Sequence, residues 1–192
     1  PTTSRVREAL MNILQGEIQN CQWLDLFSGS GVVGCEALQR GARRVCSVES
    51  HKNTAHICHS NLISTASGIF QQNYIEVFCS EVNKFLREGC LKHSFKFTSV
   101  FPNSDPRFDF VYIDPPYQSN LYSSALDNLL HGGWIKSNSL VICEYSKKFS
   151  ADISSSWKVF DEKNYGNSNI VLITPNQASH YLYDIGSKPQ QI

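Results

Sequence analysis

A glycine-rich turn between a short apolar segment and a helical one constrains the fold of this chain more than any other feature. Residues 23–27, Trp-Leu-Asp-Leu-Phe, have the composition of a buried strand, and Ser28-Gly-Ser-Gly follows directly. Residues 32–40 then form a helical pattern that Gly41 is suited to end as a C-cap. The glycines at 29, 31 and 34 let the chain turn tightly and let a ligand approach the backbone. The sequence therefore predicts a strand–turn–helix unit with the spacing of a nucleotide-binding turn.

The same alternation of strands and helices continues along the chain. Residues 93–107, which include Pro102 and Pro106, are expected to form an irregular loop. The order of elements predicts an α/β fold with a doubly wound, mostly parallel sheet, in which ligands bind at the carboxyl ends of strands. Further strands are expected at 44–48, 74–79, 108–113, 140–144, 157–162 and 169–173, and helices at 5–14, 53–64, 82–91 and 121–130.

Composition limits the classes of protein to which the chain can belong. Its 192 residues suit one domain, and a net charge of +0 lacks the basic footprint of a dedicated nucleic-acid binder. Its 7 cysteines, without C-x-x-C spacing, predict free thiols in a reducing cytosol and no metal site. No apolar run reaches the ~18 residues of a membrane span. We therefore expect a cytoplasmic monomer. Arg5, Arg7, Arg40, Arg43 and Arg44 are candidates for contact with phosphates, but each is expected to be an ordinary solvated charge.

Two acidic residues beside the glycine turn bear on the ligand that it binds. Glu49 follows the second strand, where its carboxylate can accept hydrogen bonds from both hydroxyls of a ribose. The turn alone is compatible with a nicotinamide dinucleotide or with S-adenosylmethionine. Asp25 favours the second, because a carboxylate just before the turn repels a pyrophosphate and suits the ammonium group of a methionine moiety.

Asp114-Pro115-Pro116-Tyr117 is the sharpest chemical motif in the chain. The two prolines remove two backbone donors and stiffen the chain after a strand, which leaves a rigid set of acceptors. The Asp114 carboxylate and the Pro115 carbonyl can hold the exocyclic amine of a nucleic-acid base, and Tyr117 offers a face for stacking that base. With the cofactor turn, the motif predicts an N-methyltransferase in which alignment and desolvation supply most of the catalysis.

In these two motifs the chain resembles the RsmD-like family of 16S ribosomal RNA guanine-N2 methyltransferases, which are class I S-adenosylmethionine-dependent methyltransferases. The similarity covers residues 1–174, whereas 175–192 are expected to form a peripheral tail, and the 93–107 segment looks long for the family. The matching stretches are Pro1-Thr-Thr-Ser-Arg-Val-Arg-Glu-Ala-Leu-Met-Asn-Ile-Leu, Leu24-Asp-Leu-Phe-Ser-Gly-Ser-Gly-Val-Val-Gly, Glu36-Ala-Leu-Gln-Arg-Gly-Ala, Asp109-Phe-Val-Tyr-Ile-Asp-Pro-Pro-Tyr and Tyr165-Gly166.

The resemblance implies a Rossmann-like, seven-stranded sheet whose last strand is antiparallel. It implies S-adenosylmethionine as methyl donor, a guanine N2 amine as acceptor, and ribosomal RNA or the small-subunit particle as partner. Glu81 replaces the usual Asp or Asn and would accept a hydrogen bond from the adenine amine. The implied catalytic residues are Asp114, Pro115, Pro116 and Tyr117, and the implied cofactor-binding residues are Asp25, Phe27, Ser28, Gly29, Gly31, Glu49, Ser50 and Glu81.

Other functions stay open on the residues alone. Adenine N6 and cytosine N4 fit the same set of acceptors. A glutamine side chain fits less well, because enzymes that methylate glutamine usually carry Asn where Asp114 stands. From another class, the alternative is an inactive cofactor-binding module in RNA assembly, and the intact Asp114 counts against it.

Overall fold

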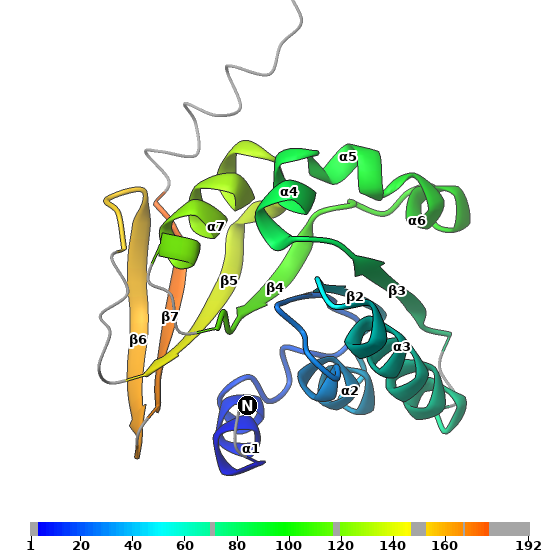
Figure 1. Cartoon of the computed structure of the whole chain (residues 1–192), viewed down its shortest axis with the longest axis horizontal. Coiled ribbons are helices and arrows are strands. Elements are labelled where there is room, and N and C mark those ends of the chain that lie inside the picture. The colour runs from blue at the N-terminus through cyan, green and yellow to red at the C-terminus, as the bar shows by residue number, and fades with distance from the viewer. Residues whose placement is uncertain (1–3, 70–71, 117–119, 147–152, 167, 177–192) are drawn as a thin grey trace, which may run out of the picture.

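In the computed structural model of the protein, seven strands of the described residues form one mixed sheet (Figure 1). The structure describes residues 4–69, 72–116, 120–146, 153–166 and 168–176. The strand order is β3-β2-β1-β4-β5-β7-β6, and β7 runs antiparallel to both of its neighbours. The α/β fold with a doubly wound, mostly parallel sheet and an antiparallel last strand is confirmed. The strands are β1 (Gln22–Leu26), β2 (Arg44–Glu49), β3 (Tyr74–Cys79), β4 (Phe108–Ile113), β5 (Ile135–Ser146), β6 (Trp157–Tyr165) and β7 (Ser168–Pro175).

Helices cover both faces of the sheet, and each face has its own apolar core. Because alternate residues of a strand point to opposite faces, Trp23 packs with α1 to α3, whereas Leu24 and Leu26 pack with α4 and α7. None of the described helices is long and apolar enough to cross a bilayer. One face carries α1 (Ser4–Ile13), α2 (Val32–Gln39) and α3 (Lys52–Ser67), and the other α4 (Val82–Arg87), α5 (Cys90–His93), α6 (Phe95–Val100) and α7 (Asn120–His131) (Figure 1).

The parallel register gathers the predicted site residues at one edge of the sheet. Leu26 at the end of β1 is opposite Val48 of β2 and Ile113 of β4. The residues that follow these positions, Phe27, Glu49 and Asp114, therefore emerge side by side at the carboxyl ends of adjacent strands. This is the edge at which doubly wound sheets bind their ligands.

The segment between β3 and β4 differs from the expectation. The helix expected over 82–91 ends at Arg87, and α5 begins after Gly89. Residues 95–100, expected in an irregular loop, form α6. That expectation was wrong because Phe97 is fully buried, with its ring 5.4 Å from that of Tyr74 between centroids. The proline and asparagine signals apply only to the residues after this helix.

Arg44 also differs from the expectation, because it is buried and was expected to be a solvated charge. Its residue is 1% exposed, and its guanidinium pairs with Glu76 at 3.0 Å and donates to the Pro106 carbonyl at 2.9 Å. The guanidinium also lies 4.2 Å from the centre of the Phe97 ring. A buried charge persists only when it is paired and hydrogen-bonded. Arg44 is therefore a structural residue that fastens the segment after α5 to the start of β2.

The cysteines agree with the expectation of free thiols. All 7 are unpaired, and Cys79 is the exposed one. The tail expected at 175–192 lies outside the described residues from 177 onward.

Candidate active site

The turn after β1 is shaped by two glycines with different tasks. Gly29 and Gly31 have φ of 54° and 77°, in the left-handed region that favours glycine. A Cβ built on Gly31 would lie 2.6 Å from Cys58 Sγ, so this glycine lets the turn pack against α3. A Cβ built on Gly29 has nothing within 4 Å. The backbone at Gly29 therefore faces open space that a ligand can fill.

Helix α3 contacts the glycine turn through two side chains. The Asn61 side chain donates from Nδ2 to the Ser30 carbonyl at 2.9 Å, and Cys58 Sγ lies 3.7 Å from Ser28 Oγ. Sequence reasoning missed this support, although it expected Cys58 to be a free thiol, as the structure shows. The available signal was the spacing of three residues between positions 58 and 61, which places both on one helical face.

Glu49 joins the end of β2 to the same turn. Its Oε2 accepts a hydrogen bond from the Gly29 amide at 3.0 Å. Its Oε1 accepts from the His51 amide at 2.8 Å and from Ser50 Oγ at 3.3 Å. The side chain is 10% exposed, so the carboxylate keeps a small accessible surface at the edge of the turn.

Asp25 is buried beneath the turn, at the end of β1. Its residue is 1% exposed, and Oδ2 has no hydrogen-bond partner in the described part of the structure. Burial raises the pKa of Asp25 to about 8; the Gly34 amide lowers it, and the charges of Asp114 and Glu49 raise it. The Asp114 and Glu49 carboxylates thus both lie close enough to act on Asp25. A positively charged ligand would relieve both their repulsion of Asp25 and its desolvation.

The predicted amine site begins where β4 ends. Asp114 is half-buried, Pro115 is buried and Pro116 is exposed. Phe27, which follows Leu26 opposite the end of β4, adopts a φ of 59°. Such a φ is uncommon for a bulky residue, and it turns the chain between β1 and the glycines. Tyr117 lies outside the described residues.

Sequence reasoning missed two tyrosines, one on β4 and one on α7, that interact with acidic groups in this region. The Tyr112 hydroxyl donates to the Glu144 carboxylate, and both residues are buried. Tyr122, on α7, has its pKa raised by burial and then by the negative charges of groups that include Asp114 and Glu144. Nothing in their spacing marks these residues, because β4, β5 and α7 come together only in the fold.

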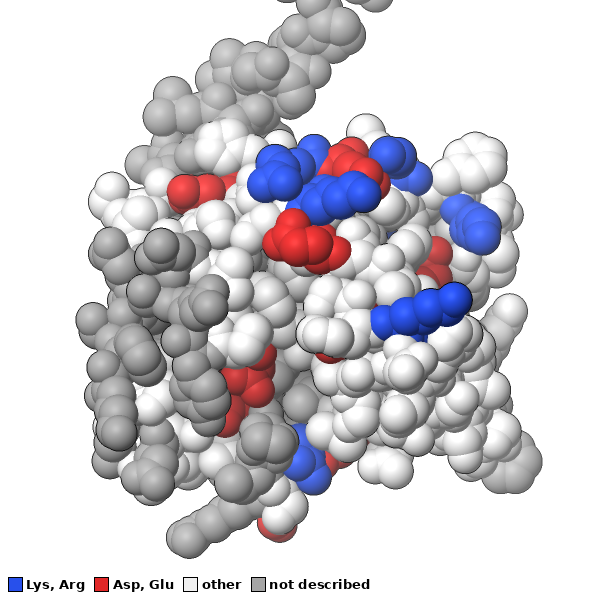
Figure 2. All heavy atoms as spheres, in the orientation of Figure 1, with Lys and Arg blue, Asp and Glu red and all other residues white. Residues whose placement is uncertain are grey.

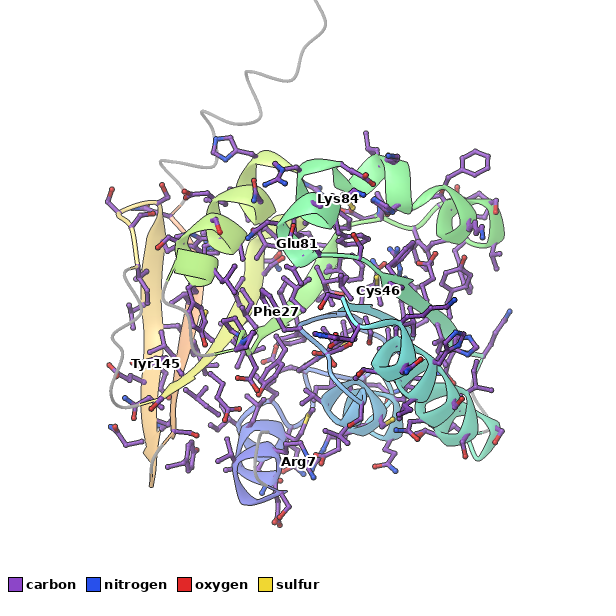
Figure 3. The ribbon with its side chains drawn as sticks, in the orientation of Figure 1. Arg7, Phe27, Cys46, Glu81, Lys84 and Tyr145 are labelled. Carbon is purple, nitrogen blue, oxygen red and sulfur yellow. The ribbon has the colours of Figure 1, made fainter. Side chains whose placement is uncertain are left out.

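Glu81 follows β3 at the same end of the sheet (Figure 3). Its carboxylate caps α4, accepting from the Asn83 amide at 2.9 Å and the Lys84 amide at 2.7 Å. The preceding Ser80 amide donates to the Glu49 carbonyl at 3.1 Å, which links this loop to β2. The structure therefore gives Glu81 a capping role, and its predicted contact with adenine stays a prediction.

The arrangement suits an organic cation better than a metal ion. Within the described residues, no group of three or more His, Cys, Asp or Glu side chains could hold a metal. A buried carboxylate with an unpartnered oxygen, an open backbone at Gly29 and a second carboxylate at Glu49 fit an amino-acid ammonium, a sulfonium and a ribose. The residues present thus fit S-adenosylmethionine.

Known proteins resemble this chain over most of its length. A family model described as Conserved hypothetical protein 95 matches residues 1–174. The chain is 32% identical to ribosomal RNA small subunit methyltransferase D of Haemophilus influenzae over 86% of this chain and 78% of the relative. It is 28% identical to the protein of the same name from Escherichia coli over 85% of this chain and 73% of the relative.

Solved structures show the same fold. A putative methylase from Haemophilus influenzae superimposes with a TM-score of 0.71 at 30% identity, covering 92% of this chain and 100% of that one. An RNA methyltransferase from Salinibacter ruber, in complex with S-adenosyl-L-homocysteine, has a TM-score of 0.61 at 12% identity, covering 100% of this chain and 97% of that one.

Proposed function

Since the chain belongs to the Conserved hypothetical protein 95 family, with the ribosomal RNA small subunit methyltransferase D proteins, we propose that it is an S-adenosylmethionine-dependent RNA methyltransferase. We further propose that its acceptor is the exocyclic N2 amine of a guanine in small-subunit ribosomal RNA, and that residues 1–174 form the catalytic domain. The observation that carries the proposal is the meeting of Asp25, Glu49 and Asp114 at one end of the sheet.

The cofactor half of the site is formed by β1, β2 and the turn between β1 and α2. S-adenosylmethionine, when bound, supplies a methyl group that its sulfonium activates. Asp25 faces the positive charge of the methionine portion, and Glu49 accepts from the ribose hydroxyls. Gly29 leaves its backbone open to the ligand. Phe27, Ser28, Gly31, Ser50 and Glu81 complete the proposed lining.

The acceptor half is formed by the residues after β4. The Asp114 carboxylate and the Pro115 carbonyl accept from the two N–H groups of the amine, which directs its lone pair toward the cofactor half. Pro115 and Pro116 hold these acceptors rigid because their rings fix φ. Tyr117 stacks on the base. Since alignment and desolvation do most of the work, no strong base is required, and the amine proton leaves to Asp114 or to water.

One experiment tests the function directly. The protein is incubated with S-adenosylmethionine carrying a labelled methyl group and, separately, naked 16S ribosomal RNA, small-subunit particles and DNA. The modified base is then mapped. We expect label on guanine N2 in RNA or particles. Label on adenine N6 or cytosine N4 would overturn the base assignment, and label on DNA alone would overturn the RNA assignment. Cofactor binding without transfer to any substrate would instead indicate an inactive module.

A further inference from the structure

A groove runs along the outer edge of the sheet, away from the candidate active site. β3 is the last strand on that side, and the groove beside it has a volume of about 480 Å³. Helix α3 contributes His59 to one wall, and helices α5 and α6 form the other. Figure 1 shows α3 on one side of β3 and α5 and α6 on the other side. Lining the second wall are Lys92, His93, Phe95 and Lys96.

The wall formed by α5 and α6 belongs to a basic segment of an otherwise neutral chain. Residues 82–100 contain four cations, Lys84, Arg87, Lys92 and Lys96, and one acid, Glu88, whereas the whole chain has a net charge of +0. All four cations are exposed. Figure 2 shows Lys and Arg gathered over α4 to α6. Lys84 lies on α4, one turn after its N-cap Glu81 (Figure 3), so the cations of this segment begin near the end of β3.

Acidic groups in and near the groove are already neutralised. Glu76, on the groove floor, pairs with the buried Arg44 at 3.0 Å. Glu88 pairs with Lys92 at 3.1 Å and with His93 at 2.7 Å. The Lys92 side chain is 63% exposed, so water and a competing anion reach it readily. Lys92 therefore shares Glu88 in an exposed ion pair that a phosphate can displace, whereas Lys96 has no ion pair within the described residues.

Aromatic rings lie among these cations. The Phe95 residue is 75% exposed, although the neighbouring Phe97 is fully buried and completes the packing of α6. Tyr74 and Phe78 lie on the groove floor, and Tyr74 is held edge-on by Phe97 at 5.4 Å and by Phe101 at 6.2 Å between ring centroids. Exposed rings beside a basic track are the features with which proteins bind single-stranded nucleic acid, by stacking bases and neutralising phosphates.

We propose that this groove binds a single-stranded segment of the RNA substrate that flanks the methylated base. The inference rests on the proposed function for the identity of the ligand. Three strand spacings of about 4.8 Å separate β3 from β4, which places the groove beyond the reach of the nucleotide at Asp114. The groove therefore holds the neighbouring chain of the substrate. The groove gives a locally basic surface to a protein whose net charge is +0.

The test compares two matched pairs of lysines. Lys92→Ala/Lys96→Ala removes the groove cations, and the control Lys158→Ala/Lys163→Ala removes two exposed lysines from β6, at the opposite edge of the sheet. Each pair contains one lysine in an exposed ion pair, Lys92 with Glu88 and Lys163 with Asp161. Binding of a fluorescent, unstructured RNA oligonucleotide is measured between about 50 and 200 mM salt.

We expect the groove pair to weaken RNA binding at least fivefold at low salt. The slope of log affinity against log salt should fall by about 1.4, since each phosphate contact with a single strand contributes about 0.7. Phe95→Ala should weaken binding about fivefold or more without changing the slope, because stacking is not electrostatic. The control variant Lys158→Ala/Lys163→Ala should change neither the RNA affinity nor the salt slope. Every variant should keep the wild-type affinity for S-adenosylmethionine, which also shows that it is folded.

Equal RNA affinity and salt slope in the groove pair and the control pair would overturn the inference. The groove could instead be an interface at which β3 pairs with a second copy of the chain. In that case sedimentation would detect a concentration-dependent dimer, and the Lys92→Ala/Lys96→Ala variant would keep its RNA affinity. This result would also overturn the inference. The proposed function fails separately, if the wild-type protein binds RNA through the groove but transfers no methyl group. If the Lys92→Ala/Lys96→Ala variant transfers methyl groups with a wild-type KM for RNA, the proposal that the groove binds RNA is refuted and the proposed function stands.

Discussion

The Glu49 carboxylate accepts a hydrogen bond from the Gly29 amide at 3.0 Å, so the acidic end of β2 holds the glycine turn that follows β1. The same carboxylate accepts from the His51 amide at 2.8 Å. In the proposed function this residue also binds the ribose. Glu49 thus has a structural task and a binding task that substitutions can separate.

Glu49→Ala is expected to weaken S-adenosylmethionine binding and also to lower stability without ligand. The backbone donors at 29 and 51 lose their acceptor; because neither position is buried, each lost hydrogen bond should cost about 0.5–1.5 kcal/mol. Glu49→Gln keeps one acceptor oxygen and should recover part of the stability but less of the affinity. Calorimetric titration and denaturant unfolding measure the two effects. Wild-type affinity in the alanine variant would refute the ribose assignment.

The buried Asp25 predicts an unusual dependence of stability on pH. Its pKa is raised to about 8 in the folded protein, from an ordinary value near 3.8. Between these values the folded state holds a proton that the unfolded state has lost, so the contribution of Asp25 to stability falls as pH rises and levels off above about 8. Asp25→Asn removes this titration. Unfolding in urea from pH 5 to 9, without ligand, should show wild type losing stability relative to the variant. A constant difference would contradict the raised pKa.

Asp114→Ala is expected to reduce methyl transfer by about 10²-fold or more, because a misaligned amine loses most of the advantage of positioning. Cofactor binding should stay largely intact, since Asp114 lies in the acceptor half. Asp114→Asn keeps one acceptor oxygen and should lose less activity than the alanine variant, because it can still accept from one N–H of the amine but has lost the negative charge. Single-turnover transfer and cofactor titration give the two readouts. A variant with wild-type turnover would remove Asp114 from its proposed role.

The two glycines of the turn should respond differently to alanine. Both have positive φ, which costs an alanine about 1–2 kcal/mol at each site. At Gly31 the new Cβ would also meet Cys58 Sγ at 2.6 Å, adding an overpacking cost of about 1–3 kcal/mol. Cys58→Ala should therefore recover stability in Gly31→Ala but not in Gly29→Ala. Unfolding of the single and double variants measures this coupling. Equal recovery in both would show that the clash is not the cause.

Much of the fold and the core of the site could be predicted, because the signals were local. The turn at 28–31 and the prolines after Asp114 can each be recognised from a few adjacent residues. The strand order then places both motifs at the carboxyl edge of the sheet. Arg44 and Phe97 could not be predicted in this way. Their burial depends on each other, and Glu76 and Pro106, which complete the cluster, come from two further segments. The Tyr112–Glu144 pair likewise exists only after β4 and β5 align.

The strand order β3-β2-β1-β4 also affects how the protein is made. The chain leaves the ribosome from β1 through β3 before it returns to place β4 against the free side of β1. The part proposed to hold the methyl donor is thus synthesised before the part proposed to hold the amine. Until Phe108 to Ile113 emerge, one side of β1 has no partner strand, and at 5–20 residues per second the intervening ~80 residues take roughly 4–16 s. An unpaired apolar edge of this kind is open to pairing with other chains, so the nascent protein is most vulnerable to aggregation in this interval.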